Sequence, residues 1–166
     1  MNLETLRTIV ALGESDQREF KKTTGELKGG IESLCAFLNG LGGQVFFGVT
    51  EAGTIRGQVI SDATLQEVAR EIVKLDPPAT VMQSRVPVEA TREVLVLEVS
   101  PGPQAPYYNG RPYRRVTSTT SLMPQAEYER RLLERLATTI FPVSDNYRLA
   151  LTPSMLFSSS TPCAAS

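Results

Sequence analysis

Two glutamates and a lysine near the start of the chain form the pattern best suited to chemistry. Glu14 and Glu19 flank four residues, and Lys21 follows two positions after Glu19. Carboxylate oxygens are ligands that Mg²⁺ and Mn²⁺ prefer, and such a metal can activate water and stabilise charge on a reacting phosphate. The pattern therefore permits a metal-dependent nuclease in which Glu14 and Glu19 hold the metal and Lys21 positions the phosphate or the water.

A short strand over residues 18–22 would position this group. Its alternation places Glu19 and Lys21 on one face and turns Phe20 towards the core. Glu14 precedes the strand, so it must fold back from a loop to reach Glu19. On spacing alone, an ordinary charged pair on an exposed strand face, matched by a neighbouring strand, is the more common explanation of Glu19 and Lys21.

A second candidate surface is the segment 107–115, which holds three tyrosines, three arginines and no acid. Arginine binds phosphate through its planar fork, and tyrosine stacks on bases. The alternative is an exposed hairpin whose tyrosines pack on the edge of the core. With basic residues nearer the N-terminus, the predicted nucleic-acid contacts are Arg18, Lys21, Lys22, Lys28, Arg111, Tyr113, Arg114 and Arg115.

The glycines at 40, 42 and 43 lie between a predicted helix and a buried strand. They favour a tight helix–strand connection, although a glycine-rich turn can also let a phosphate approach backbone N–H groups.

No lysine follows a glycine, so a P-loop is absent. The chain has no histidine, which excludes histidine catalysis and His-liganded zinc, and its two cysteines, Cys35 and Cys163, lie too far apart for a zinc ribbon.

Hydrophobic periodicity predicts a single α+β domain over residues 1–136, with a mixed, mostly antiparallel sheet packed by about four helices. A break is expected at Gly29-Gly30, and Tyr128, Leu132 and Leu136 should form the inner stripe of the last helix. The expected helices cover 2–12, 31–38, a stretch from 62 to the prolines at 77–78, and 124–136. The expected strands cover 18–22, 44–50, 55–59, 81–88, 93–100 and 112–117, with burial on both faces for 94–97.

Residues 137–166 are expected to be a tail with little charge. The apolar part of this tail, 149–157, is a candidate contact for a partner or a second copy of the chain.

The 166 residues carry a formal net charge of −1, so a nucleic-acid surface would have to be a local patch. The chain shows neither a secretory leader nor a membrane-spanning apolar run. We therefore expect a cytoplasmic protein with no membrane partner.

Five short motifs, taken in order, resemble the Schlafen AlbA-type domain, which has also been called a divergent AAA or ATP-binding domain. They are Glu14-Ser15-x-x-x-Glu19-Phe20-Lys21, Ala36-Phe37-x-Asn39-x-x-Gly42-Gly43, Phe47-Gly48-Val49, Gly53-Thr54-Ile55-x-Gly57 and Arg111-x-Tyr113-x-Arg115. The resemblance covers about residues 7–136. It implies a nucleic-acid-binding α+β domain with a regulatory or defence role.

In nuclease members of that family, the resemblance implies that Glu14 and Glu19 act with a third acid on tRNA or rRNA, supported by Lys21. The third acid falls on Thr50, which is a poor metal ligand, and Glu51 can substitute only if the strand ends at Val49. Three hypotheses follow. The chain is a DNA- or RNA-binding module, an Mg²⁺- or Mn²⁺-dependent endoribonuclease using Glu14, Glu19, Lys21 and Glu51, or an interaction domain with a vestigial site.

Overall fold

The computed structural model describes residues 1–102 and 104–140, and the predicted tail from 141 onward lies outside this part. In chain order the elements are α1 (Leu3–Ala11), β1 (Arg18–Lys21), the 3-10 helix η1 (Thr24–Glu26), α2 (Leu27–Leu38), β2 (Gly43–Phe47), α3 (Asp62–Ile72), β3 (Leu75–Asp76), β4 (Met82–Glu89), β5 (Arg92–Val99), β6 (Tyr107–Tyr108), β7 (Tyr113–Val116), β8 (Thr119–Leu122) and α4 (Gln125–Ile140).

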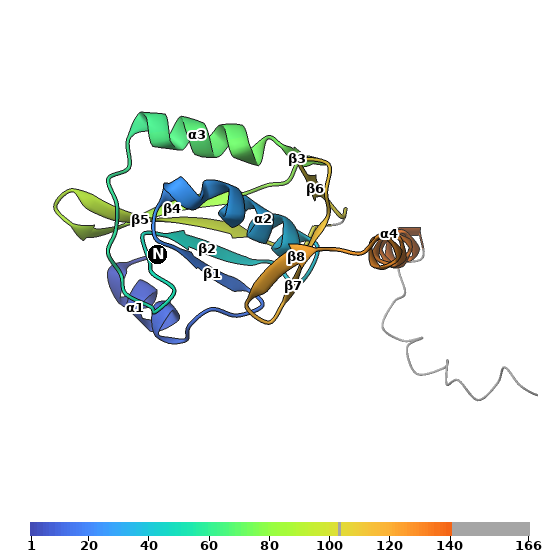
Figure 1. Ribbon diagram of the computed structural model, residues 1–166, viewed down its shortest axis with the longest axis horizontal. Coiled ribbons are helices and arrows are strands. Elements are labelled where there is room, and N and C mark those ends of the chain that lie inside the picture. The colour runs from blue at the N-terminus through green and yellow to red at the C-terminus, as the bar shows by residue number, and fades with distance from the viewer. Residues whose placement is uncertain (103, 141–166) are drawn as a thin grey trace, which may run out of the picture.

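The central sheet has four strands in the order β1-β2-β5-β4 (Figure 1). Strand β1 runs parallel to β2, and the other two pairings are antiparallel. The parallel pair needs a crossover connection, which α2 supplies. The prediction of an α+β domain with a mixed, mostly antiparallel sheet is confirmed.

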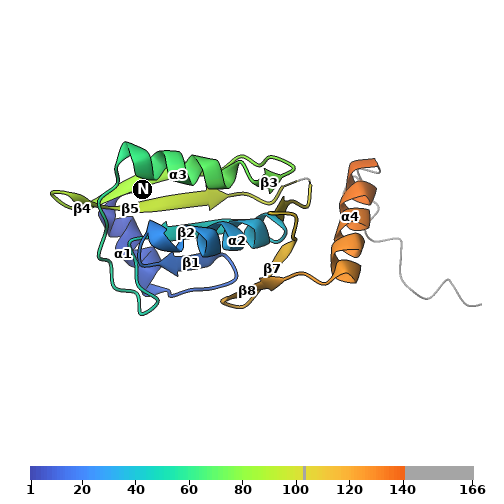
Figure 2. The ribbon, with the colours of Figure 1, turned by 45° about the horizontal axis from the view of Figure 1, so that its top comes forward.

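Both faces of this sheet are covered. On one face, α1 packs through Leu6 and Val10 against Phe20 and Phe46. On the other face, α2 and α3 pack against Val45, Phe47, Leu95 and Leu97. Figures 1 and 2 show α1 on the opposite side of the sheet from α2 and α3. Residues 94–97 of β5 alternate between these two cores, which confirms their predicted burial on both faces.

Helix α2 begins at Leu27, so the predicted break at Gly29-Gly30 is wrong. Both glycines lie inside the helix. A Cβ at position 30 would come within 2.4 Å of the Phe47 ring, so the absence of a side chain lets α2 approach β2 closely. Gly30 therefore reflects helix–sheet packing rather than the end of an element.

The predicted strand at 55–59 is also not formed. Only isolated bridges join Val49 to Ile55 and Gln58 to Glu93. Gly48 and Gly57 have φ values of 111° and 61°, which interrupt the extended backbone on both sides of the turn. Strand β2 accordingly ends at Phe47, three residues before Thr50.

Two small sheets and α4 complete the described part. Strand β3 pairs with β6, and β7 pairs with β8, both antiparallel. Helix α4 lies beyond the β7–β8 hairpin, apart from the main sheet (Figure 2). It crosses the predicted domain boundary at 136 and runs to Ile140.

The predicted inner stripe of α4 is only partly correct. Tyr128 is buried and Leu132 packs beside it, but Leu136 is 54% exposed. In the later turns of α4, arginine side chains rather than apolar ones make the contact with the rest of the protein. Arg131 donates to the carbonyl of Asn39, and Arg135 donates to the carbonyl of Leu38 at 3.0 Å. These bonds satisfy carbonyls at the C-terminal end of α2.

Within residues 1–102 and 104–140, none of the helices combines the length and the apolar composition that spanning a bilayer requires.

Candidate functional site

Strand β1 brings Glu19 and Lys21 together on one face, as its alternation predicts. The Lys21 Nζ atom lies 2.6 Å from Glu19 Oε1. Phe20 points to the opposite face and packs edge-on against Phe46, with ring centroids 5.8 Å apart. The Glu19 carboxylate is buried, with 8% of its side chain exposed, so this is not the exposed charged pair that the alternative reading describes.

Arg115 on β7 supplies a second cation to Glu19. One guanidinium nitrogen contacts Glu19 Oε2, and only 4% of the Arg115 side chain is exposed. This contact is an ion pair rather than an aligned hydrogen bond, because Glu19 Oε2 accepts none. The other Arg115 nitrogens donate to the carbonyls of Ser15 and Arg18 at 3.0 and 2.9 Å. Arg115 therefore fastens the β7–β8 hairpin to the 15–18 segment.

Glu14 joins this group from the preceding loop, as predicted. Its Oε1 accepts the Phe20 N–H at 2.9 Å, which folds the loop back onto β1. Burial raises the pKa of Glu14 above its ordinary value, the Phe20 bond opposes this rise, and the nearby charge of Glu19 adds to it. We call Glu14, Glu19, Lys21 and Arg115 the ion-pair network.

Neither candidate for a third acid joins the network. The Thr50 hydroxyl accepts the Thr54 N–H at 3.0 Å and closes the 50–54 turn. Glu51 lies exposed on that turn. Among the residues that the structure describes, no three His, Cys, Asp or Glu side chains are grouped so that they could hold a metal ion. The donor set therefore does not fit Mg²⁺ or Mn²⁺, which require several oxygen ligands.

Several of the predicted nucleic-acid contacts are engaged within the protein. Arg18 donates to the Gly13 carbonyl at 2.9 Å, and Arg114 is paired with Glu127 on α4. The Tyr113 hydroxyl donates to Glu32 at 3.1 Å. Together with Lys21 and Arg115, these residues use their polar groups to hold the fold, which leaves little of the 107–115 segment for bases or phosphates.

The tyrosines of that segment pack on the edge of the core. Tyr108 is buried, and its hydroxyl donates to Glu71 at 2.5 Å. The Tyr107 and Tyr128 rings lie 4.6 Å apart. The acids Glu32, Glu71 and Glu127 that receive these groups were not singled out from the sequence. No local motif marks the contacts of these acids with Tyr113, Tyr108 and Arg114, because those partners are 13 to 81 residues away.

The remaining predicted contacts, Lys22, Lys28 and Arg111, are exposed and make no ion pair within the described chain. Lys21 and Lys28 line a polar pocket of about 480 Å³ at the start of α2. Glu67 and Glu71 of α3 form part of its wall, and Glu71 is already paired with Lys74 at 2.5 Å. Of the exposed cations, Lys28 therefore lies in the first turn of α2 near these two acids, whereas Arg111 lies on the β6–β7 turn.

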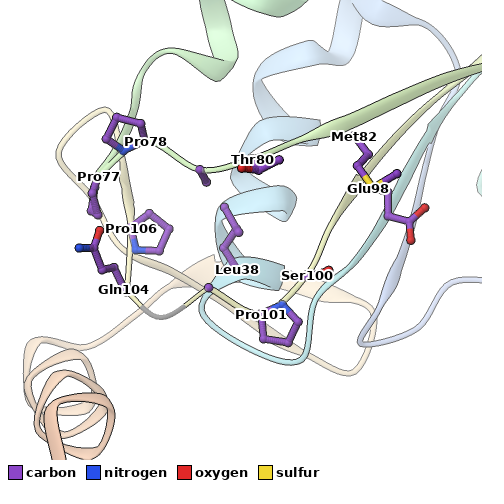
Figure 3. Close-up of a pocket in the computed structure, with 12 residues that line it drawn as sticks. Leu38, Pro77, Pro78, Thr80, Met82, Glu98, Ser100, Pro101, Gln104 and Pro106 are labelled. Carbon is purple, nitrogen blue, oxygen red and sulfur yellow. The ribbon is translucent and has the colours of Figure 1, made fainter. Parts of the chain in front are cut away.

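A separate, mainly apolar pocket of about 380 Å³ lies at the far end of α2 (Figure 3). Four prolines and Leu38 surround it, with Glu98 and Met82 at one end and Gln104 at the other. Glu98 accepts a hydrogen bond from Gln44 at 2.9 Å. None of the residues of the ion-pair network lines this pocket.

Comparison with solved structures supports the fold. A crystal structure of the DIP2311 protein from Corynebacterium diphtheriae matches with a TM-score of 0.51 and 18% identity. The match covers 78% of this chain but only 28% of that protein, so the chain corresponds to about a quarter of its length. At this identity the likeness concerns the fold alone.

Family comparison is more specific. No curated protein matches the sequence. The sequence profile of the family described as "Schlafen, AlbA_2" matches residues 14–124, a span that begins at Glu14 and includes Arg115. The chain therefore belongs to the Schlafen AlbA_2 family, whose membership is consistent with a nucleic-acid-related role.

Proposed function

We propose that the chain binds RNA or DNA through the exposed cations at the start of α2 and on the β6–β7 turn. The observation that carries the proposal is that Lys22, Lys28 and Arg111 stay exposed and unpaired, while the other predicted basic contacts are engaged internally. Membership in the family supports the same role.

Lys22 precedes α2, Lys28 lies at its start, and Arg111 lies on the β6–β7 turn. Lys28 is in its first turn, and Glu32 follows one turn later. Glu32 accepts the Tyr113 hydroxyl, and the charge of Arg111 acts on the same tyrosine. The proposed path of the phosphate backbone runs from Lys22 and Lys28, at the start of α2, to Arg111 beside Tyr113. Glu26 and Glu67 line the pocket beside Lys28 and make no ion pair among the described residues, and these acids favour weak binding that depends strongly on salt.

The test is fluorescence anisotropy of the full chain with a labelled RNA hairpin and a matched DNA duplex. The variant Lys22→Gln/Lys28→Gln/Arg111→Gln should bind about tenfold more weakly or worse at low salt. The control Arg7→Gln/Arg56→Gln/Arg85→Gln removes the same charge from other elements and should bind like wild type. Equal losses in both variants, or no binding by wild type at low salt, would contradict the proposal.

The same reactions, run on a denaturing gel with Mn²⁺, test the endoribonuclease hypothesis. The geometry does not favour it, because the Glu19 carboxylate is covered by two cations and neither Thr50 nor Glu51 joins it. We expect bound RNA to remain intact. Cleavage that is lost in Glu19→Ala would establish the enzyme despite this geometry.

A further inference from the structure

The Glu19 carboxylate already has a cation at each oxygen. Lys21 lies at Oε1, and Arg115 lies at Oε2. With Glu14 and Glu19 counted as carboxylates, the network holds two negative and two positive charges, so it is electrically neutral. A divalent cation would add two positive charges to a buried, balanced group, which is unfavourable unless a resident cation leaves.

Arg115 is poorly able to leave. Its guanidinium also donates to the Ser15 and Arg18 carbonyls and to the Thr120 hydroxyl, the last at 2.9 Å. It lies over the Phe37 ring, 5.4 Å from the centroid. Moving it would break these contacts together and would take one donor from the Ser15 carbonyl and one from the Arg18 carbonyl, of which the latter also accepts the Ser15 N–H at 3.1 Å.

We propose that the Arg115 guanidinium is the resident cation of the Glu14–Glu19 site and occupies the position that a divalent metal would need. It neutralises Glu19 and ties β1 to the β7–β8 hairpin, so the acidic pair acts as a structural anchor that does not take up Mg²⁺ or Mn²⁺. Thr50, with its hydroxyl engaged in the 50–54 turn, adds no acid that would favour a metal. This inference goes beyond nucleic-acid binding and holds whether or not the chain binds nucleic acid.

The test is a titration of the full chain with Mn²⁺, without nucleic acid. Electron paramagnetic resonance measures the concentration of Mn²⁺ that remains free. Wild type should not bind Mn²⁺ at this site at concentrations up to about 1 mM, near the weak end of protein sites for divalent cations. Wild-type binding that disappears in Glu19→Gln would overturn the proposal. Mn²⁺ binding that is unchanged in Glu19→Gln takes place at another site, and this outcome agrees with the proposal.

The Arg115→Gln variant removes the resident charge. If it folds, as checked by circular dichroism, it should bind Mn²⁺ on the order of tenfold or more tightly than wild type, and Glu19→Gln in the same chain should remove the gain. Arg115→Lys keeps a positive charge and should show no gain. A folded Arg115→Gln chain without the gain would overturn the proposal. If that chain does not fold, the comparison of wild type with Glu19→Gln decides.

Discussion

The cations of the ion-pair network and the exposed cations Lys22, Lys28 and Arg111 behave in opposite ways, although Lys21 and Lys22 are neighbours in the sequence. Lys21 and Arg115 are drawn onto the buried Glu19 carboxylate, whereas Lys22 and Arg111 remain exposed. The end of β1 accounts for the difference between Lys21 and Lys22. Strand alternation turns Lys21 towards α2, and β1 ends at Lys21, so Lys22 lies outside the strand. A basic stretch of sequence is therefore not by itself a basic surface.

Removal of the buried cation Arg115 should have the largest effect on the free energy of unfolding. Arg115→Ala leaves Glu19 paired only with Lys21 and should lower the free energy of unfolding by about 3–5 kcal/mol. The exposed counterpart Arg111→Ala should change it by less than about 0.5 kcal/mol. Urea denaturation followed by circular dichroism measures both. Similar losses in the two variants would remove the distinction between the two regions.

A smaller effect is expected where α2, which carries the exposed Lys28, packs on the sheet. Gly30→Ala places a methyl group against the Phe47 ring and should cost about 1–3 kcal/mol. Gly29→Ala meets only the end of the Lys21 side chain at 3.6 Å, so improved helix propensity should stabilise the chain by about 0.5–1 kcal/mol. Thermal unfolding of the pair should show shifts of opposite sign. Two shifts of the same sign would contradict the packing described here.

The tyrosines of the 107–115 segment test whether this segment, like the ion-pair network, uses its polar groups within the protein. Tyr108→Phe removes the hydrogen bond to Glu71 and should cost about 1 kcal/mol at pH 7. Bonds from Lys74 and Tyr108 hold the pKa of Glu71 below its ordinary value of 4.5. The ionised form is thus favoured by folding, and its contribution is complete above pH 4.5 and lost as pH falls through the lower folded pKa.

The measurement is therefore the unfolding of Tyr108→Phe and wild type at pH 7 and near pH 3. The difference between them should shrink at the lower pH. A difference that stays the same would mean that the Tyr108 hydroxyl does not stabilise the Glu71 carboxylate.

The smallest effect on stability is expected at the exposed cations. Lys22→Gln/Lys28→Gln/Arg111→Gln should change the free energy of unfolding by less than about 0.5 kcal/mol per site. The logarithm of the nucleic-acid association constant should fall with the logarithm of salt with a slope of up to about −3 for wild type and closer to zero for this variant. Titrations at several salt concentrations measure the slope. An unchanged slope would place the phosphate contacts elsewhere.

Local patterns predicted much of the fold. Alternation in β1 correctly placed Glu19, Phe20 and Lys21, and the apolar run at 94–97 correctly indicated a strand buried on both faces. The helix over 31–38 was identified, but its start was not. The glycines at 29 and 30 are typical of a break, and only the position of the Phe47 ring explains why they lie in a helix.

The candidate site was harder to predict, because its decisive contacts join residues that are distant in the chain. Glu19 and Arg115 are 96 positions apart, and no periodicity links them. The sequence indicated that Arg115 was a phosphate ligand, since nothing near it is acidic. Its burial against Glu19 arises from the docking of the β7–β8 hairpin beside β1, which is a tertiary arrangement.

The most direct test of the central claim is a double-mutant cycle between Glu19 and Arg115. The free energy of unfolding would be measured by urea denaturation for wild type, Glu19→Gln, Arg115→Gln and the double variant. A buried ion pair predicts a coupling energy of about 1–3 kcal/mol, with the double variant losing less than the sum of the single losses. Additive losses would contradict the claim that Arg115 is held by Glu19.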